Sequence, residues 1–270
     1  MDAGTLTALD RNYRTASAEM FANSDKGASF ETRDVHCVSS GYPLVDFNWA
    51  FLKRPDSEPA SAIERAERYF DERRTPFRFV VRGDLAVGCE ALLESRGHQR
   101  QSLANPGMSI TPLRDSPAQP TGLRIVPVDS PQTLADFQLA AFGGFGFPAA
   151  LGARFLTARL LESPESALLV GYVGGEHGGE VEGDSRGEPV ATSMLIATGR
   201  IAGIYWVATL EAHRRKGYAE ALTWAALAAG RSRGCTIGSL QASALGRPVY
   251  ARMGFEQTAE YVHFQRPAAG

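Results

Sequence analysis

Hydrophobic and polar positions follow two spacings along the chain, one helical and one typical of strands, and together they predict a mixed α/β protein. In the first hundred residues the spacing predicts a helix, two strands, a helix, a strand and a helix, at 5–22, within 35–52, and at 58–73, 77–83 and 84–97. From residue 121 the order is strand, two helices, three strands, helix, strand, helix and strand. These ten elements are expected at 123–130, 131–142, 148–163, 167–175, 189–199, 201–210, 213–234, 235–243, 244–254 and 255–265.

A proline-rich segment separates the two patterns. Residues 104–121 contain four prolines around one short predicted strand, and the order of elements changes after them. We therefore expect a boundary near residue 118, with a smaller N-terminal α/β domain at 1–118 and a second domain at 119–270.

The composition excludes several classes of protein. Of the 270 residues, 44% are hydrophobic and 21% are charged, which is typical of a globular protein with a sizeable core. The net charge of -2 leaves no basic excess, so we expect no nucleic-acid partner. No apolar run approaches the roughly 18 residues of a membrane span, and the N-terminus lacks the pattern of a signal peptide. A cytoplasmic protein without a membrane partner is expected.

Neither a disulfide framework nor a metal site is predicted. Cys37, Cys89 and Cys235 lie far apart and form no CxxC pair, so we expect them to be buried as small hydrophobic side chains. The segment 174–188 is rich in glycine and acidic residues, which is typical of a solvated hairpin loop. Glu176 and His177 are the only conceivable metal ligands there.

The stretch EAHRRKGYAEAL, residues 211–222, carries the strongest chemical signal. It follows the strand at 201–210, which is apolar on both faces and is therefore expected to be central. Three adjacent cations and Gly217 then precede a predicted helix, whose first backbone N–H groups have no partner within the helix. This arrangement predicts a cradle for a pyrophosphate. No Walker A motif occurs, and the G-x-G-x-x-A match in GFGFPA follows a predicted helix, where a dinucleotide site would need a preceding strand.

The residues 214–219, RRKGYA, fit the pattern [QR]-x-x-G-x-[GA] and resemble the acetyl-CoA pyrophosphate motif of the GNAT N-acetyltransferase family. The segment LQASALGRPVYARMGF, 240–255, is similar to the later strand and helix of that family. The resemblance covers 121–270. It implies the GNAT acyltransferase fold, acetyl-CoA as cosubstrate without a metal, and transfer of the acetyl group to a primary amine by direct attack on the thioester.

The resemblance also assigns roles to residues of the cofactor site. The strand segment Val207, Ala208 and Thr209 would pair with the pantetheine arm where this strand splays from the next, and a backbone N–H near Val207 would polarise the acetyl carbonyl. The pyrophosphate would be held chiefly by the backbone of Arg214, Arg215, Lys216, Gly217, Tyr218, Ala219 and Glu220. Side chains of the cations would only screen charge, and the Glu220 carboxylate should point away from the phosphates.

Tyr250 is the candidate general acid, because a phenol near the sulfur can protonate the departing thiolate. The alternative for Tyr250 is a packed helix aromatic. Ser243 stands where family members often carry an asparagine that contacts the cofactor. Glu211 and His213 are expected to be turn residues, so no general base is named.

The acceptor is left open by the residues. The loop AFGGFGFP, 141–148, is expected either to form an apolar, mobile lip of the acceptor pocket or to make core contacts on either side of a hinge. A lip would favour a hydrophobic or aromatic amine.

The N-terminal part has no such turn and resembles the degenerate GNAT half of two-part actinobacterial members; an unrelated α/β cap is the alternative. The leading interpretation of the whole chain is an N-acetyltransferase of a small-molecule amine. A protein or peptide acetyltransferase and a non-catalytic acyl-CoA-binding regulatory module remain as alternatives, and a homodimer is left open.

Overall fold

The computed structural model describes residues 2–53, 58–102, 105–175 and 186–266, and the chain forms two compact units. The first unit comprises Met1–Met108, Gln241–Pro248 and Glu256–Gly270, and the second comprises Ser109–Leu240 and Val249–Phe255. The strand β6 (Asn105–Ile110) lies at the boundary in the chain and is the short strand expected inside the proline-rich segment.

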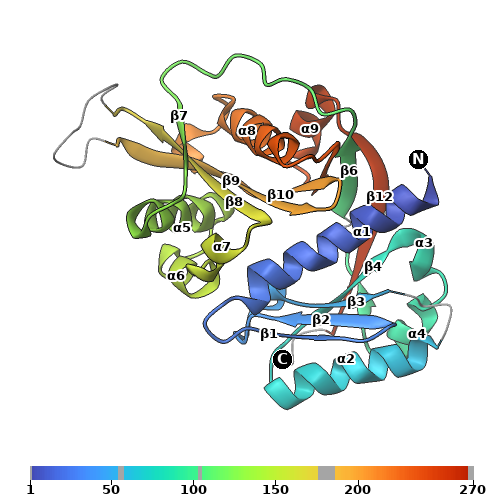
Figure 1. Ribbon diagram of the computed structural model, residues 1–270. Helices are drawn as coiled ribbons and strands as arrows, with labels where there is room; N and C mark the ends of the chain where they lie inside the picture. The colour runs from blue at the N-terminus through green and yellow to red at the C-terminus, as the bar shows by residue number, and fades with distance from the viewer. Residues whose placement is uncertain (1, 54–57, 103–104, 176–185, 267–270) are drawn as a thin grey trace. The chain divides into compact units, whose positions relative to one another are not determined.

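The first unit is built around a sheet in the order β1-β2-β3-β4-β12 (Figure 1). Neighbouring strands are antiparallel except β3 and β4, and β5 pairs with β12. The strands are β1 (Ala28–Glu31), β2 (Val35–Ser39), β3 (Asn48–Leu52), β4 (Arg78–Arg82), β5 (Gln99–Arg100) and β12 (Glu256–Gln265). The helical elements are α1 (Ala3–Ser17), the π-helical turn η1 (Ala18–Ala22), η2 (Val45–Phe47), α2 (Pro59–Arg73), α3 (Gly83–Ala86) and α4 (Glu90–Ser95).

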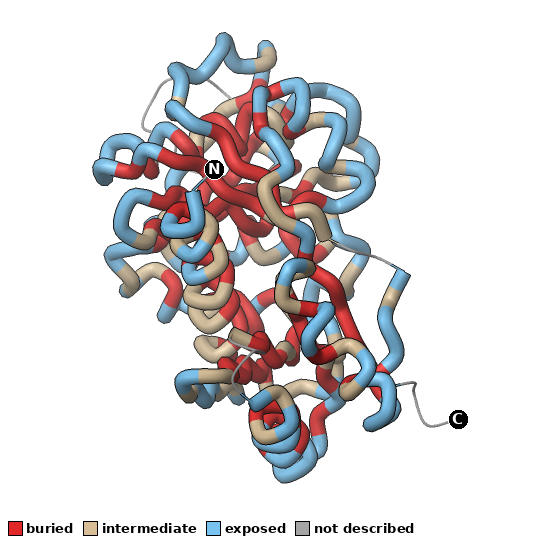
Figure 2. Tube along the Cα trace, turned by 90° about the vertical axis from the view of Figure 1, so that its right-hand side faces the viewer, coloured by how far each residue is buried: buried red, intermediate tan, exposed pale blue. Residues whose placement is uncertain are grey.

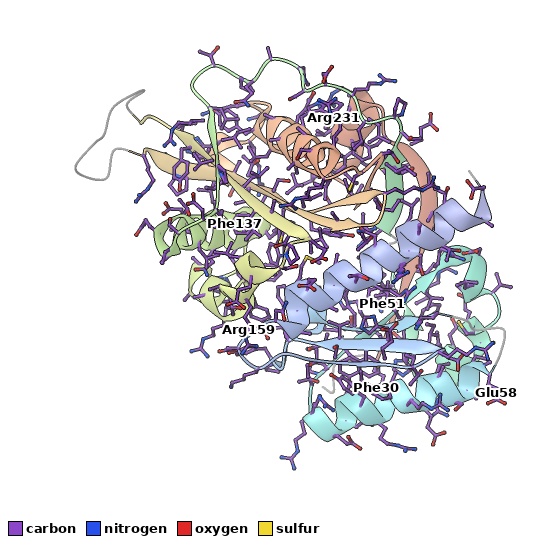
Figure 3. All side chains as sticks on the ribbon, in the orientation of Figure 1. Phe30, Phe51, Glu58, Phe137, Arg159 and Arg231 are labelled. Atoms are coloured by element: carbon purple, nitrogen blue, oxygen red, sulfur yellow. The ribbon has the colours of Figure 1, made fainter. Side chains whose placement is uncertain are left out.

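Apolar residues at helical spacing explain why two helices pack on this sheet. In α2 the buried positions Ala62, Ile63, Ala66, Tyr69 and Phe70 form one stripe within the main core of the unit. Tyr13 of α1 instead makes edge-on ring contacts with Trp49, Phe51 and Tyr261. Phe51 is labelled in Figure 3, and Figure 2 shows the buried strands in red.

The second unit has a sheet in the order β7-β8-β9-β10-β11, with only the β10–β11 pair parallel. Its strands are β7 (Arg124–Pro127), β8 (Ser166–Val173), β9 (Glu188–Thr198), β10 (Ile201–Thr209) and β11 (Ile237–Gln241). Its helical elements are α5 (Pro131–Phe145), η3 (Ala149–Leu151), α6 (Gly152–Phe155), α7 (Arg159–Glu162), η4 (Glu211–His213), α8 (Tyr218–Ser232) and α9 (Arg247–Met253), the last beginning in residues of the first unit. The two long helices α5 and α8 cover opposite faces of the strands (Figure 1), with Phe137 of α5 fully buried (Figure 3).

The mixed α/β class and the order of the long elements are confirmed, and the differences have local causes. The helix expected at 148–163 consists of three short pieces, because the carbonyl of Leu156 leaves the helical ladder and accepts a hydrogen bond from Gln138 Nε2 at 2.8 Å. The helix expected at 84–97 is interrupted at Cys89, whose φ of -130° is not helical. The short strands β1 and β5 were not predicted.

The last strand groups differently from the sequence-based division at residue 118. β12 pairs with β4 along Tyr261–Gln265, so residues 256–270 lie in the first unit although the sequence placed them in the second domain. The partner of a strand is a long-range property that its own residues do not encode.

The three cysteines are buried and form no disulfide, as expected. Burial raises the pKa of the Cys37 thiol to about 12 and that of Cys89 to about 11. Among the described residues, no helix is both long and apolar enough to cross a membrane.

A buried carboxylate ties three segments of the first unit together. Glu67 of α2 accepts hydrogen bonds from Arg96 Nε at 3.0 Å, from Arg266 at 2.6 Å and from the ring of the fully buried His98 at 3.0 Å. Burial alone would raise the pKa of Glu67, but the hydrogen bonds from Arg96 and His98 and the charge of Arg266 outweigh it and hold the pKa below its ordinary value.

Replacement of this carboxylate should destabilise the protein in a pH-dependent way. Glu67→Gln leaves the partly buried cations without their counter-charge, so we expect a loss of about 3 kcal/mol in unfolding free energy near neutral pH. Because the folded-state pKa is depressed, the wild type loses this contribution as pH falls through that pKa, and the difference between the two proteins should narrow in acid. Denaturant unfolding of the wild type and Glu67→Gln at neutral and acid pH measures this difference in unfolding free energy. Glu64→Gln, at a side chain 61% exposed on the same helix, is the control and should change stability by about 0.5 kcal/mol or less. Equal effects of the two variants would contradict the assignment.

Candidate active site

A β-bulge interrupts β10 near its end. Tyr205 pairs with Met194 and Ala208 pairs with Thr192, so that Trp206 and Val207 both stand opposite Ser193. Trp206 has a φ of +48°, a conformation that a bulky residue rarely adopts. A bulge leaves its extra residue outside the ladder and bends the strand, and such strain is found at functional sites.

Three contacts hold Trp206 in this conformation. Phe142 of α5 stacks on the indole with a centroid distance of 5.1 Å and an interplanar angle of 18°, and Phe145 meets the indole edge-on at 5.5 Å. The hydroxyl of Thr192 donates to the carbonyl of Trp206 at 2.7 Å. The bulge is therefore built into the packing of α5 on β9 and β10.

The parallel strands β10 and β11 pair only over a short length. Their register joins Ile201–Gly203 to Ile237–Ser239, whereas β10 continues to Thr209. The bulged end of β10 is thus free of β11 pairing in the described structure. This end of β10 contains Val207, Ala208 and Thr209, and their pairing with a pantetheine arm stays a prediction.

The chain then enters a turn at residues 214–217, which we call the cradle turn. Arg215 has a φ of +65° and Gly217 a φ of +80°, and α8 begins at Tyr218 without a side-chain cap. Closely spaced left-handed positions of this kind aim successive N–H groups toward one point. Within the described residues, no hydrogen bond uses the backbone N–H groups of 215–220, and the next one along the chain, that of Ala221, donates to the carbonyl of Gly217. Successive unpaired donors at a helix N-terminus are the groups by which proteins bind anions.

The cations of the turn differ in their roles. Arg214 donates to the carbonyl of Gly144 at 3.0 Å and to that of Thr209 at 3.4 Å, so it links the turn to α5 and β10. Arg215 and Lys216 are exposed and form no ion pair with any described residue. Of the three predicted cations, two are therefore free to screen a bound anion, and the third fixes the turn.

Tyr250 lies in α9 and is buried, with its ring edge-on to Phe255 at a centroid distance of 5.8 Å. Burial raises its pKa to about 12, so the phenol keeps its proton at neutral pH. The aromatic packing expected under the alternative interpretation is present, and the role of general acid stays a prediction.

The remaining candidate residues are placed as follows. Ser243 is exposed and accepts a hydrogen bond from the N–H of Gly246, just before α9. Ser243 belongs to the first unit, and its contact with the cofactor stays a prediction. His213 is paired with Glu188 at 3.2 Å, while Glu211 is exposed in η4. Glu176 and His177 lie outside the described residues.

The glycines at 143 and 144 prove to be packing residues. They lie inside α5, which extends to Phe145, so the expected loop at 141–148 is shorter and does not contain a hinge at these positions. A Cβ at Gly144 would come within 2.8 Å of the Ala208 side chain and 3.0 Å of the Thr209 nitrogen. Phe142 is fully buried, whereas Phe145 is 49% exposed beside Trp206. Phe142 makes the core contact expected under the second alternative, without a hinge at Gly143 and Gly144, and a lip of an acceptor pocket stays a prediction.

Two hydroxyls at the bulge were not singled out for their chemistry. The oxygens of Ser193 and Thr209 are buried and have no hydrogen-bond partner within the described structure. Buried polar atoms of this kind call for a ligand or a water. The sequence placed Thr209 in the cofactor site through its backbone, and it gave no signal for Ser193 beyond a hydroxyl in an otherwise apolar strand.

Comparison with known proteins agrees with this geometry. Residues 143–258 match the model of the acetyltransferase (GNAT) domain. This segment is similar to the GNAT acetyltransferase domain. The family is one of acyltransferases, which makes acyl transfer the activity expected of this unit. A search of curated proteins gave no match.

Solved GNAT structures share the fold over most of the chain. A GCN5-related N-acetyltransferase from Kribbella flavida superposes with a TM-score of 0.70 and 17% identity, over 97% of this chain and 96% of that one. One from Sphaerobacter thermophilus gives 0.62 and 16%, over 88% and 82%. A tandem GNAT protein from the clavulanic acid biosynthesis pathway gives 0.59 and 14%, over 98% and 95%. The likeness in fold therefore includes the first unit. The degenerate GNAT character of this unit stays a prediction.

The close approach of α5 to β10 can be tested with two adjacent glycines. Gly144→Ala would push a methyl group against Ala208 and the backbone of Thr209, and we expect it to lower stability by about 1–3 kcal/mol and to displace the cradle turn. In Gly143→Ala the new methyl meets only the end of the Leu210 side chain, at 2.9 Å, which can rotate away. That variant should be neutral or gain up to about 1 kcal/mol from helix propensity. Thermal unfolding compares them, and a Gly144→Ala protein as stable as Gly143→Ala would refute the packing role.

Proposed function

We propose that this protein transfers the acetyl group of acetyl-CoA to a primary amine of a small molecule. The observation that carries the proposal is the cradle turn together with the first turn of α8, where the six backbone N–H groups of 215–220 have no partner among the described residues, directly after a bulged strand. A pyrophosphate fits these donors, because an anion there is stabilised by both the N–H groups and the helix dipole.

The residues around the turn fit the rest of acetyl-CoA. Its thioester supplies the activated acetyl group. The bulged segment Val207–Thr209 offers backbone outside the β10–β11 pairing for the pantetheine arm, and the N–H near Val207 would donate to the acetyl carbonyl. Tyr250 would hold the proton that the departing sulfur takes, at its Oη.

The side chains beside the bulge favour an acceptor with an apolar body. Phe145 is half exposed and lies edge-on to Trp206, next to the strand segment assigned to the reacting group. The side-chain oxygens of Ser193 and Thr209 at the bulge are buried hydroxyls without a hydrogen-bond partner among the described residues. An amine with a hydrophobic or aromatic body is compatible with this surface, and a polycation is not favoured by it.

Protein or peptide amines are the second class of acceptor, and a panel of small amines and peptides separates the two classes. Release of free thiol distinguishes either enzyme from a module that only binds acyl-CoA. We place turnover first because Tyr250 keeps its proton at neutral pH and the backbone donors of 215–220 have no partner among the described residues.

Acetyl-CoA should raise the melting temperature of the protein, and Gly217 should control this effect. At a concentration of 100 Kd the expected stabilisation is about 2.7 kcal/mol. Gly217→Glu would place a carboxylate at the cradle turn and should abolish the shift. Gly217→Asn is the matched control, because asparagine tolerates the positive φ and adds no charge, so the shift should be largely retained. A thermal-shift titration of the three proteins tests this, and no wild-type shift at millimolar acetyl-CoA would refute the binding claim.

Removal of the Tyr250 hydroxyl should slow the chemical step. We expect Tyr250→Phe to lower kcat about 10²-fold with little change in KM for acetyl-CoA, since the ring packing is kept. Because burial raises the phenol pKa to about 12, deprotonation of Tyr250 should cause no alkaline loss of wild-type activity below that value. Steady-state thiol release across pH measures both. A kcat equal to that of the wild type would exclude Tyr250 as the general acid.

A further inference from the structure

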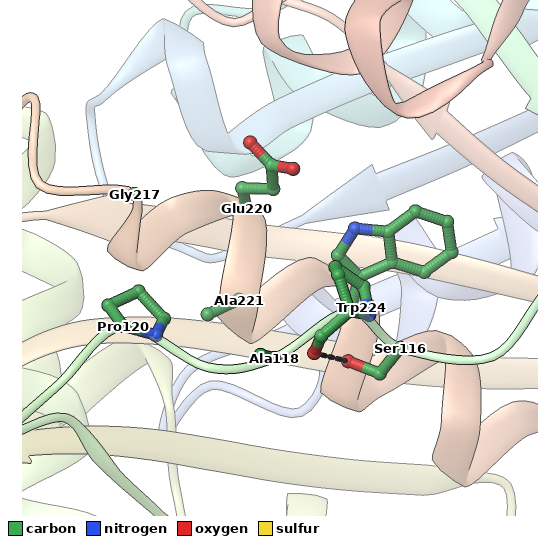
Figure 4. A pocket seen from close by; sticks show the side chains of 8 residues that line it. Ser116, Ala118, Pro120, Gly217, Glu220, Ala221 and Trp224 are labelled. Atoms are coloured by element: carbon green, nitrogen blue, oxygen red, sulfur yellow. Dashed lines mark hydrogen bonds between the residues drawn. The ribbon is translucent and has the colours of Figure 1, made fainter.

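A small pocket lies beside the cradle turn, on the outer side of α8. It has a volume of about 230 Å³ and is lined by Ser116, Pro117, Ala118, Pro120, Gly217, Glu220, Ala221 and Trp224 (Figure 4). The volume is below the roughly 300–1,000 Å³ of sites for complete drug-sized ligands, so it fits one ring system and not a whole cofactor.

One wall of the pocket is a single stripe of α8. Gly217, Glu220, Ala221 and Trp224 are spaced by three and four residues, so they share one face of the helix. Gly217 also belongs to the cradle turn. The pocket and the proposed pyrophosphate site therefore meet at this residue.

The opposite wall is the strap, which we define as residues 111–120 between β6 and β7. The strap passes over α8 in Figure 1, and the middle and the C-terminal end of the strap meet α8. Asp115 pairs with Arg231 of α8 at 2.7 Å (Figure 3 labels Arg231), and a Cβ built at Gly217 would lie 3.5 Å from the ring of Pro120. Prolines and alanine give this wall a rigid, apolar surface against which a planar ring can stack.

Two polar groups of the pocket lack a partner. Trp224 is only 6% exposed, and its indole N–H is buried without a hydrogen bond to any described residue. Glu220 forms no ion pair within the described chain, although its carboxylate stands one helical turn from the cradle turn. A carboxylate so close to a bound pyrophosphate would be repelled unless a hydrogen-bond donor of the ligand faced it.

One ligand edge satisfies both groups. An adenine presents an amino group that donates and ring nitrogens that accept, side by side on one planar apolar ring. A pyrophosphate in the cradle turn has two substituents, and when the pantetheine arm follows β10, the nucleoside lies at the other end. We infer that the pocket between the strap and α8 is a subsite for the adenine of CoA, with Glu220 accepting from the amino group and Trp224 Nε1 donating to a ring nitrogen.

This inference rests on the proposed use of acetyl-CoA and gives the strap a function in cofactor selection. It predicts that the protein distinguishes CoA from its hypoxanthine analogue, which carries an oxygen in place of the amino group and so turns an acceptor toward the Glu220 carboxylate. By the usual value of a buried hydrogen bond, the wild type should bind the analogue about tenfold more weakly.

Calorimetric titration of the full chain with CoA and with the hypoxanthine analogue tests the subsite. In Glu220→Gln the amide can also donate, so the preference for CoA should fall to about twofold or less. Trp224→Phe keeps an aromatic ring and removes the N–H, and it should weaken CoA binding roughly tenfold. The matched control is Trp49→Phe, which removes another buried, unpartnered indole N–H, in the first unit, and should leave the affinity for CoA unchanged.

The outcomes separate this inference from the proposed function. Wild-type binding of CoA and the analogue with equal affinity, or equal affinities of Trp224→Phe and Trp49→Phe for CoA, would overturn the adenine subsite and leave the acetyltransferase proposal standing. No binding of CoA by the wild type would overturn both.

Discussion

The positive φ of Trp206 is the constraint on which the geometry of this site depends. A bulky residue adopts that conformation only when its surroundings enforce it, and here Phe142, Phe145 and the hydroxyl of Thr192 do so. The bulge bends β10 where its pairing with β11 has already ended. The bulge therefore bends the part of β10 that pairs with β9 and not with β11, and that part leads directly to the cradle turn.

Arg214 extends this constraint to the anion site. Its guanidinium joins the carbonyl of Thr209, at the end of the bulged strand, to the carbonyl of Gly144 in α5. The close approach of α5 to β10 is itself possible because Gly144 has no Cβ. The hydrogen bonds of the Arg214 guanidinium therefore fix the turn that carries the N–H donors of 215–220 without a bound anion. The entropy lost by ordering this turn on binding would be small. Arg214 of the motif fixes the turn, whereas Arg215 and Lys216 carry charges that form no ion pair with a described residue.

The sequence was informative where the chemistry depends on the backbone. A strand, a glycine that tolerates positive φ and a helix start lie next to one another in the chain, so the cradle turn could be predicted from Arg214–Ala219 alone. Contacts between distant segments could not. The roles of Gly143 and Gly144, the grouping of β12 with the first unit and the strap over α8 each depend on a partner far along the chain. The interpretation of 141–148 as a loop was incomplete for this reason. The sequence alone does not distinguish a glycine that lets a helix approach a strand from a glycine of a hinge.

Protonation limits the acceptors that such a site can use. The raised pKa of Tyr250 keeps its phenol protonated at neutral pH, so Tyr250 cannot act as the base. The ring of His213 is paired with Glu188. The buried hydroxyls of Ser193 and Thr209 cannot take a proton from an amine at neutral pH. Under the proposed acetyl transfer, an amine acceptor would arrive uncharged or lose its proton to water. Amines of low basicity meet this condition at neutral pH, whereas an alkyl amine with the pKa of a lysine side chain, about 10.4, is almost entirely protonated there. Under the proposed acetyl transfer, a lysine acceptor would therefore depend on proton loss to water, whereas an amine of low basicity would not.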